Sequence, residues 1–119
     1  MTDRKELKQR YKERKPDMGV FAVRNLSNGR VFLGTTPDLR EALNSNRFRL
    51  KAGMHENGEL QRDFARLGEA SFAFEVLDRI EPKEDPAVDV SDELKALKGL
   101  WLEKLQPYAD RGYHRKSGT

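Results

Sequence analysis

The chain has 119 residues, of which 36% are hydrophobic and 36% are charged, and its formal net charge is +3. This length fits one small domain with a modest core, and no apolar run approaches the roughly 18 residues that a membrane span needs. The absence of cysteine excludes disulfides and thiolate metal sites, and two histidines alone cannot build a zinc site. No basic-then-apolar leader opens the chain, so we expect a cytoplasmic protein without a membrane partner.

Residues 3–14 favour a helix whose side chains are mostly basic. Leu7 and Tyr11 are its only apolar residues, and their i,i+4 spacing lets them hold one face of the helix against the body of the protein. Pro16 ends it. We predict a basic N-terminal helix over 1–15, a single domain over 16–109 and a basic, flexible tail over 110–119.

Two short strands follow the proline. Residues 18–24 and 30–34 alternate apolar and polar side chains, and Asn28-Gly29 between them is a strong hairpin signal because both residues tolerate positive φ. The stretch that spans them reads GVFAVRNLSNGRVFLG, with a phenylalanine in each strand at Phe21 and Phe32.

The middle of the chain predicts two helices and a third strand. Thr36 is a good N-cap with Pro37 as the first helical residue, and Gly53 is a plausible end of this first helix. A second helix is expected from about Gly58 to Leu67, ended by Gly68. Residues 71–80 then predict a strand with Phe72, Phe74, Val76 and Ile80 on one face.

An acidic, proline-containing loop over 81–90 leads to the last helix, expected from Ser91 to Gln106 and ended by Pro107. The order is helix, strand, strand, helix, helix, strand, helix. It predicts a small α/β domain of the α+β kind, in which a three-stranded sheet opens with a hairpin and is flanked by helices. A hairpin at the start, with no glycine-rich phosphate loop after a strand, argues against a dinucleotide-binding fold.

Two polar residues interrupt apolar helical stripes. Asn46 lies in line with Leu39 and Leu50, and Lys98 lies in line with Leu94 and Trp101. A lysine rarely lies fully buried without a partner, so each of these residues could simply reach water from a boundary position. Two interruptions on helices that flank one small sheet favour a shared cleft instead.

The ordered set of motifs along residues 16–114 resembles the GIY-YIG nuclease family. GVF (19–21) and FLG (32–34) are similar to the two halves of that motif at its usual separation of about ten residues. GTTPDL (34–39), LKAGMHENGELQRDF (50–64) and WLEKLQPY (101–108) resemble the stretches that follow in homing-endonuclease-like members. The resemblance implies a three-stranded antiparallel sheet flanked by helices, and metal-assisted hydrolysis of DNA as the ancestral activity.

The resemblance also places five catalytic positions of the family on this chain, and each of the five is substituted. The two tyrosines fall on Phe21 and Phe32, the arginine on Ala42, the histidine on Asn46 and the metal-binding glutamate on Lys98. Phenylalanine lacks a hydroxyl to position water, alanine cannot stabilise negative charge, and a lysine repels a divalent ion. We therefore expect a degenerate domain without a cofactor; Mg²⁺ or Mn²⁺ would be needed only by a surviving nuclease.

The leading hypothesis from the sequence is a DNA-binding or other nucleic-acid-binding module. Non-specific phosphate contacts would come from the basic 4–15 helix and from Arg24, Arg30, Arg40, Arg47, Arg49, Lys51 and Lys98, with His55 as a further candidate. One alternative is a divergent endonuclease with a relocated site that uses Arg49, His55 and a carboxylate that the sequence does not identify. The other is a protein-interaction module that docks a partner through the acidic 81–93 loop.

Overall fold

The computed structural model describes residues 16–81 and 89–115. Their order along the chain is two strands, two helices, a short 3₁₀ turn, a third strand, a last helix and a second 3₁₀ turn. The elements are β1 (Met18–Asn25), β2 (Val31–Thr36), α2 (Leu39–Ala52), α3 (Gly58–Leu67), η1 (Glu69–Ser71), β3 (Phe72–Ile80), α4 (Ser91–Leu105) and η2 (Ala109–Arg111).

The three strands form one antiparallel sheet in the order β2-β1-β3, so the hairpin-first, three-stranded prediction is confirmed. The hairpin turn lies where Asn28-Gly29 predicts it. Asn28 Oδ1 accepts a hydrogen bond from the Arg30 amide, and the Gly29 amide donates to the Asn25 carbonyl at 2.8 Å. Because β1 is central, β2 and β3 are both edge strands.

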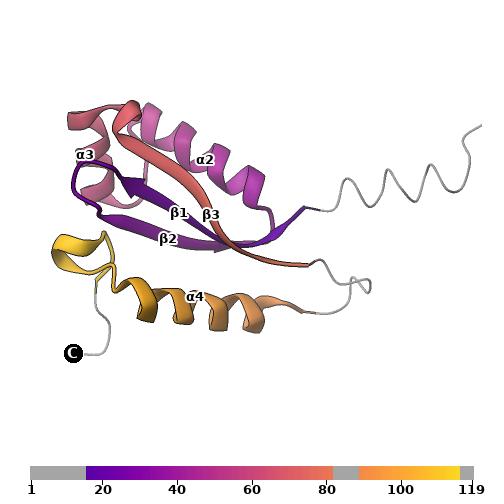
Figure 1. The fold of residues 1–119 in the computed structure, drawn as a ribbon. Helices are drawn as coiled ribbons and strands as arrows, with labels where there is room; N and C mark the ends of the chain where they lie inside the picture. The colour runs from indigo at the N-terminus through magenta and orange to yellow at the C-terminus, as the bar shows by residue number, and fades with distance from the viewer. Residues whose placement is uncertain (1–15, 82–88, 116–119) are drawn as a thin grey trace, which may run out of the picture.

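Helices cover both faces of this sheet, with α2 and α3 on one face and α4 on the other (Figure 1). The α2–α3 face encloses a core around Val23, Leu60 and Phe64. The α4 face encloses a smaller core in which Val31 and Leu33 pack against Trp101. Alternating residues of β2 therefore belong to different cores, with Phe32 in the first and its two neighbours in the second.

The start of α2 differs from the expectation that Thr36 is its N-cap. Asp38 has extended backbone angles and its side chain accepts a hydrogen bond from the Glu41 amide, so Asp38 is the cap and Leu39 the first helical residue. Thr36 Oγ1 instead bonds with the backbone of Asp38. The carboxylate displaces the hydroxyl because Asp38 lies next to the helix, whereas Thr36 still belongs to β2. The end at Gly53 agrees with the prediction, with φ of 75°.

Strand β3 carries a bulge that alters the predicted pattern of its side chains. The pairing shifts between Val20 and Phe21: Phe21 pairs with Val76 but Val20 pairs with Asp78. One extra residue on β3 reverses which face the following side chains occupy. Ile80, which pairs with Met18, therefore lies on the face opposite to Phe72 and Phe74, and the prediction of one shared face for all of them is wrong at Ile80.

The segment after α4 differs most from its prediction as a flexible tail. Gly112 and Tyr113 are buried, and the Tyr113 amide donates to the Val31 carbonyl at 3.1 Å along the free edge of β2. Gly112 fits because a Cβ there would lie 2.1 Å from the Pro107 carbonyl oxygen. Residues 110–115 thus belong to the folded domain. The buried side chain of Tyr113 and its backbone hydrogen bond to the edge of β2 anchor them there.

Some predictions fall outside the described residues. These are the basic helix over 1–15, most of the acidic loop (82–88) and the last residues of the tail (116–119). Within residues 16–81 and 89–115, none of the helices is both long enough and apolar enough to cross a membrane.

Candidate functional site

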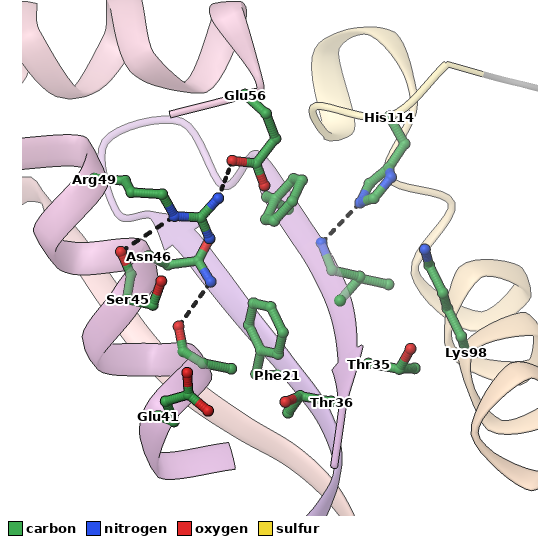
Figure 2. A pocket seen from close by; sticks show the side chains of 14 residues that line it. Phe21, Thr35, Thr36, Glu41, Ser45, Asn46, Arg49, Glu56, Lys98 and His114 are labelled. Atoms are coloured by element: carbon green, nitrogen blue, oxygen red, sulfur yellow. Dashed lines mark hydrogen bonds and ion pairs between the residues drawn. The ribbon is translucent and has the colours of Figure 1, made fainter. Parts of the chain in front are cut away.

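A cavity of about 510 Å³ lies along the edge of β2, between α2 and α4 (Figure 2). All five positions that the resemblance to the nuclease family singles out line it. They are Phe21, Phe32, Ala42, Asn46 and Lys98. These residues come from two strands and two helices and are up to 77 positions apart in sequence (98 − 21), so only the fold brings them together.

Two phenylalanine rings form the apolar floor of this cavity. The centroids of Phe21 and Phe32 are 6.4 Å apart, and their planes are tilted by 54°. Gly34 allows this arrangement, because a Cβ there would lie 2.4 Å from Cζ of Phe21. The floor offers shape and apolar surface but no hydroxyl that could donate or accept a proton.

Asn46 and His55 form a buried pair on the α2 side. Asn46 is 2% exposed, its Nδ2 donates to the Ala42 carbonyl at 2.7 Å, and its Oδ1 lies 2.7 Å from Nε2 of His55. The Asn57 amide donates to Nδ1 of His55 at 3.0 Å, so Nε2 carries the proton. Asn46 can therefore lie buried within the apolar stripe, because its side-chain amide forms hydrogen bonds within the protein.

The predicted phosphate contact at His55 does not fit this geometry. Its side chain is fully buried and both ring nitrogens have protein partners. Burial lowers the pKa of His55 most strongly, the charge of Glu56 raises it and that of Arg49 lowers it further. His55 is a neutral structural residue beneath the cavity, and its edge contact with the Phe32 ring at 5.3 Å supports the floor.

Arg49 faces the cavity from α2, as its spacing from Asn46 predicts. Its guanidinium pairs with Glu56 and its Nε donates to the Ser45 carbonyl at 3.4 Å (Figure 2). The positive charge on this wall is thus largely balanced by a neighbouring carboxylate.

The α4 wall contains Lys98 and a residue that the sequence analysis did not single out, His114. Lys98 is half-buried and has no hydrogen bond or ion pair with any residue in the described part of the chain. The Leu33 amide donates to Nε2 of His114 at 2.7 Å, and the imidazole stacks on the Phe32 ring with the centroids 5.3 Å apart. The one sequence signal for His114 is its position beside Tyr113, an aromatic residue in an otherwise polar tail.

Five of the cations proposed for phosphate contact do not line this cavity: Arg24, Arg30, Arg40, Arg47 and Lys51. Four of these five form ion pairs within the protein, with N···O distances of 3.2 Å for Arg24–Glu75, 3.2 Å for Arg30–Asp63, 3.5 Å for Arg47–Glu69 and 3.3 Å for Lys51–Glu69. Arg40 is exposed, with no ion pair to another described residue. Of the seven candidates, Lys98 alone combines a place in the cavity with a charge that no described residue balances.

The residues of the cavity do not suit a divalent metal ion. Its carboxylates are Glu41 and Glu56, and Glu56 is already engaged by Arg49. Lys98 adds a positive charge opposite them. Within residues 16–81 and 89–115, no group of three or more histidine, aspartate and glutamate side chains converges as metal ligands would.

The two histidines predict a pH-dependent stability. Burial lowers the pKa of both below 6.5, and the charge of Lys98 lowers that of His114 further. Below that pH an unfolded histidine binds a proton that the folded one does not, so the free energy of unfolding falls as the pH falls. The expected slope between about pH 6.5 and 5 is at most about 1.4 kcal/mol per pH unit for each histidine.

Urea denaturation at several pH values measures this slope, and an NMR titration of the histidine Cε1 protons assigns it. The variant His114→Gln is expected to reduce the slope by about half, since one titrating group remains. Native-state pKa values at or above 6.5 for both residues would contradict the prediction.

Comparison with known proteins identifies the fold. No protein-family model matches the sequence. No curated protein matches it either. Among solved structures, the catalytic domain of homing endonuclease I-TevI superposes with a TM-score of 0.66 at 24% identity, over 81% of this chain and 95% of that one. A mutant of the catalytic domain of intron endonuclease I-TevI gives a TM-score of 0.67 at 22% identity, over 87% and 97%.

I-TevI is a GIY-YIG homing endonuclease. The fold that the resemblance implies is therefore confirmed: the chain has the mixed α+β architecture of the GIY-YIG catalytic domain, with a three-stranded antiparallel sheet between helices.

Proposed function

We propose that this domain binds nucleic acid through the cavity along β2 and does not cleave it. The observation that carries the proposal is Lys98, a cation that points into the cavity and has no partner among the described residues. An ammonium group in a partly enclosed, polar cavity is suited to bind a phosphate oxygen. The surrounding protein excludes part of the solvent, so the two charges attract each other more strongly than they would in open water.

The rim of the cavity supports this assignment. Thr35 and Thr36 on β2 and Ser45 on α2 add hydroxyl groups around the apolar floor. Hydroxyl and ammonium groups are among the donors that contact a nucleic-acid backbone, and such contacts position a duplex or single strand without reading its sequence. We therefore expect little sequence preference.

Loss of cleavage follows from the side chains at the five positions. Phe21 and Phe32 have no hydroxyl to position an attacking water, and Ala42 provides no donor for a developing negative charge. Lys98 occupies the position where the resemblance implies a metal-binding carboxylate. The structural neighbours are endonuclease catalytic domains by name, so the proposal is that a shared fold here serves binding alone.

A binding titration tests the proposal. Fluorescence anisotropy with labelled single- and double-stranded DNA is expected to show weak binding whose affinity falls as the salt concentration rises from about 50 mM to about 200 mM. The variant Lys98→Met should weaken binding and make the slope of log K against log salt shallower by about 1, because one phosphate contact is lost. Lys95→Met, on the exposed face of the same helix, is the matched control and should leave the cavity unchanged.

Two outcomes would contradict the proposal. One is the absence of DNA binding at low salt. The other is reproducible nicking of supercoiled plasmid in the presence of Mg²⁺ or Mn²⁺, which would favour a divergent endonuclease. That alternative can no longer use His55 as its base, because the imidazole is enclosed and both nitrogens are engaged.

A further inference from the structure

The imidazole of His114 has a fixed orientation and a fixed tautomer. The Leu33 amide can only donate, so Nε2 of His114, at 2.7 Å, must be the acceptor with its lone pair directed at that amide. In a neutral imidazole the proton is then on Nδ1. The imidazole also stacks on the Phe32 ring with an interplanar angle of 6°, and this contact stabilises the same ring orientation.

The edge of β2 explains why this bond exists. Val31 and Leu33 direct backbone groups away from β1: the Val31 carbonyl accepts from the Tyr113 amide, and the Leu33 amide donates to His114. The segment 112–114 thus takes the place of a further strand beside β2. The edge of the sheet engages Nε2. The Nδ1–H group, on the other side of the ring, has no partner among the described residues.

Charges are separated across the cavity. Figure 2 shows Glu41, Arg49 and Glu56 on the α2 side, and His114 and Lys98 together on the α4 side. Burial above all, and then the charge of the neighbouring Lys98, lowers the pKa of His114, so the imidazole is neutral at pH 7. Both carboxylates of the cavity thus lie on the same side as Arg49. The ammonium group of Lys98 and the Nδ1–H group of His114, the two donors without a described partner, lie on the opposite wall.

We propose that the Nδ1–H group of His114 and the ammonium group of Lys98 together bind a phosphate oxygen on the α4 wall of the cavity. This inference deepens the proposed nucleic-acid function, and it rests on that function for the identity of the ligand as a phosphodiester. It assigns His114 as a neutral donor whose direction the sheet edge sets, and Lys98 as the charge that attracts the anion. The site requires no metal ion.

Two substitutions of His114 separate its two bonds. Glutamine places its amide oxygen near the position of Nε2, so His114→Gln keeps an acceptor for the Leu33 amide but loses the donor at Nδ1. Asparagine places its amide nitrogen near the position of Nδ1, so His114→Asn keeps the donor but leaves the Leu33 amide without its acceptor. The first variant therefore tests the ligand contact and the second tests the structural bond.

The experiment uses the full chain, with inorganic phosphate and a short DNA duplex as probes. Nitrogen-15 NMR of the imidazole is expected to show the Nδ1–H tautomer for His114, and phosphate should shift its Nδ1 signal but not those of His55. His114→Gln should bind both probes about tenfold more weakly, with its Tm nearly unchanged. His114→Asn should bind within about threefold of the unaltered protein, with a Tm about 5 °C lower.

Failure of this inference can be distinguished from failure of the proposed function. If DNA binds and His114→Gln binds it as tightly as the unaltered protein, the donor role is overturned while the proposed function stands. Equal losses of affinity in both variants would also overturn it, since His114 would then act only through the structure. If phosphate binds with the expected pattern and DNA does not bind, the anion site stands and the nucleic-acid function fails.

Discussion

Replacement of Tyr113 by alanine is expected to lower the free energy of unfolding by about 4 kcal/mol. Tyr113 is 5% exposed and belongs to the same core as Val23, Leu60 and Phe64. Truncation removes the buried ring from this core. It leaves a cavity that the surrounding side chains cannot fill, because helices pack against both faces of the sheet. It also removes the anchor that holds residues 112–114 against β2, so the loss exceeds that of an ordinary surface aromatic.

The hydroxyl of Tyr113 accounts for part of this loss. It donates to Oδ2 of Asp63 at 2.8 Å and accepts from Nδ2 of Asn25, a fully buried residue, at 3.0 Å. Tyr113→Phe is expected to cost about 1–2 kcal/mol, since the amide of Asn25 is left without an acceptor. Burial above all, with Asp63, raises the pKa of Tyr113 to about 12, so these bonds persist at alkaline pH.

Chemical denaturation monitored by fluorescence measures both variants. Phe48→Ala is the matched control, because Phe48 is 68% exposed and its truncation should change stability by no more than about 0.5 kcal/mol. A Tyr113→Ala variant as stable as the control would contradict the docking of residues 110–115 onto the domain.

Local signals in the sequence were enough to predict most of the elements. Asn28-Gly29 fixes the hairpin, and the spacing of Leu60 and Phe64 between Asn57 and Gly68 fixes α3, because turns and amphipathic helices depend on neighbours within a few positions. The cap of α2 was misplaced by two residues, where a threonine and an aspartate compete for one role. The bulge in β3 was missed because the pairing of distant strands produces it.

The candidate site was predictable only in part. The resemblance gives five positions, and the fold brings them to one cavity, although nothing local relates Phe21 to Lys98. His114 was missed because its role depends on an unpaired amide of an edge strand about 80 residues away. The burial of His55 was missed for a similar reason: the turn AGMHENG is polar in sequence, and only the packing of α2 against α3 encloses the ring.

Arg30 shows most clearly how a basic residue can be misassigned from sequence. It was predicted to contact phosphate, yet its side chain is only 19% exposed. The guanidinium pairs with Asp63 at 3.2 Å and with Glu59, and it donates to the Gly112 carbonyl. It also lies 4.3 Å from the centroid of the Tyr113 ring. These contacts connect the hairpin, α3 and the C-terminal segment, which is a structural role.

Arg30→Met is therefore expected to lower the free energy of unfolding by about 3 kcal/mol. The substitution leaves Asp63, whose side chain is 15% exposed, without its closest cation, and it removes a donor from the Gly112 carbonyl. Arg24→Met is the matched control: both partners of Arg24–Glu75 are about a third exposed, so its loss should stay within about 1 kcal/mol.

DNA titrations of the same two variants complete the test, because a structural role and a phosphate-contact role have opposite signatures. If Arg30 is structural, Arg30→Met keeps the salt slope of the unaltered protein at temperatures where it is folded, and only its stability falls. A variant as stable as Arg24→Met, with a salt slope shallower by about 1, would instead restore Arg30 as a phosphate contact. The nucleic-acid surface would then extend from the cavity to the hairpin side of α3.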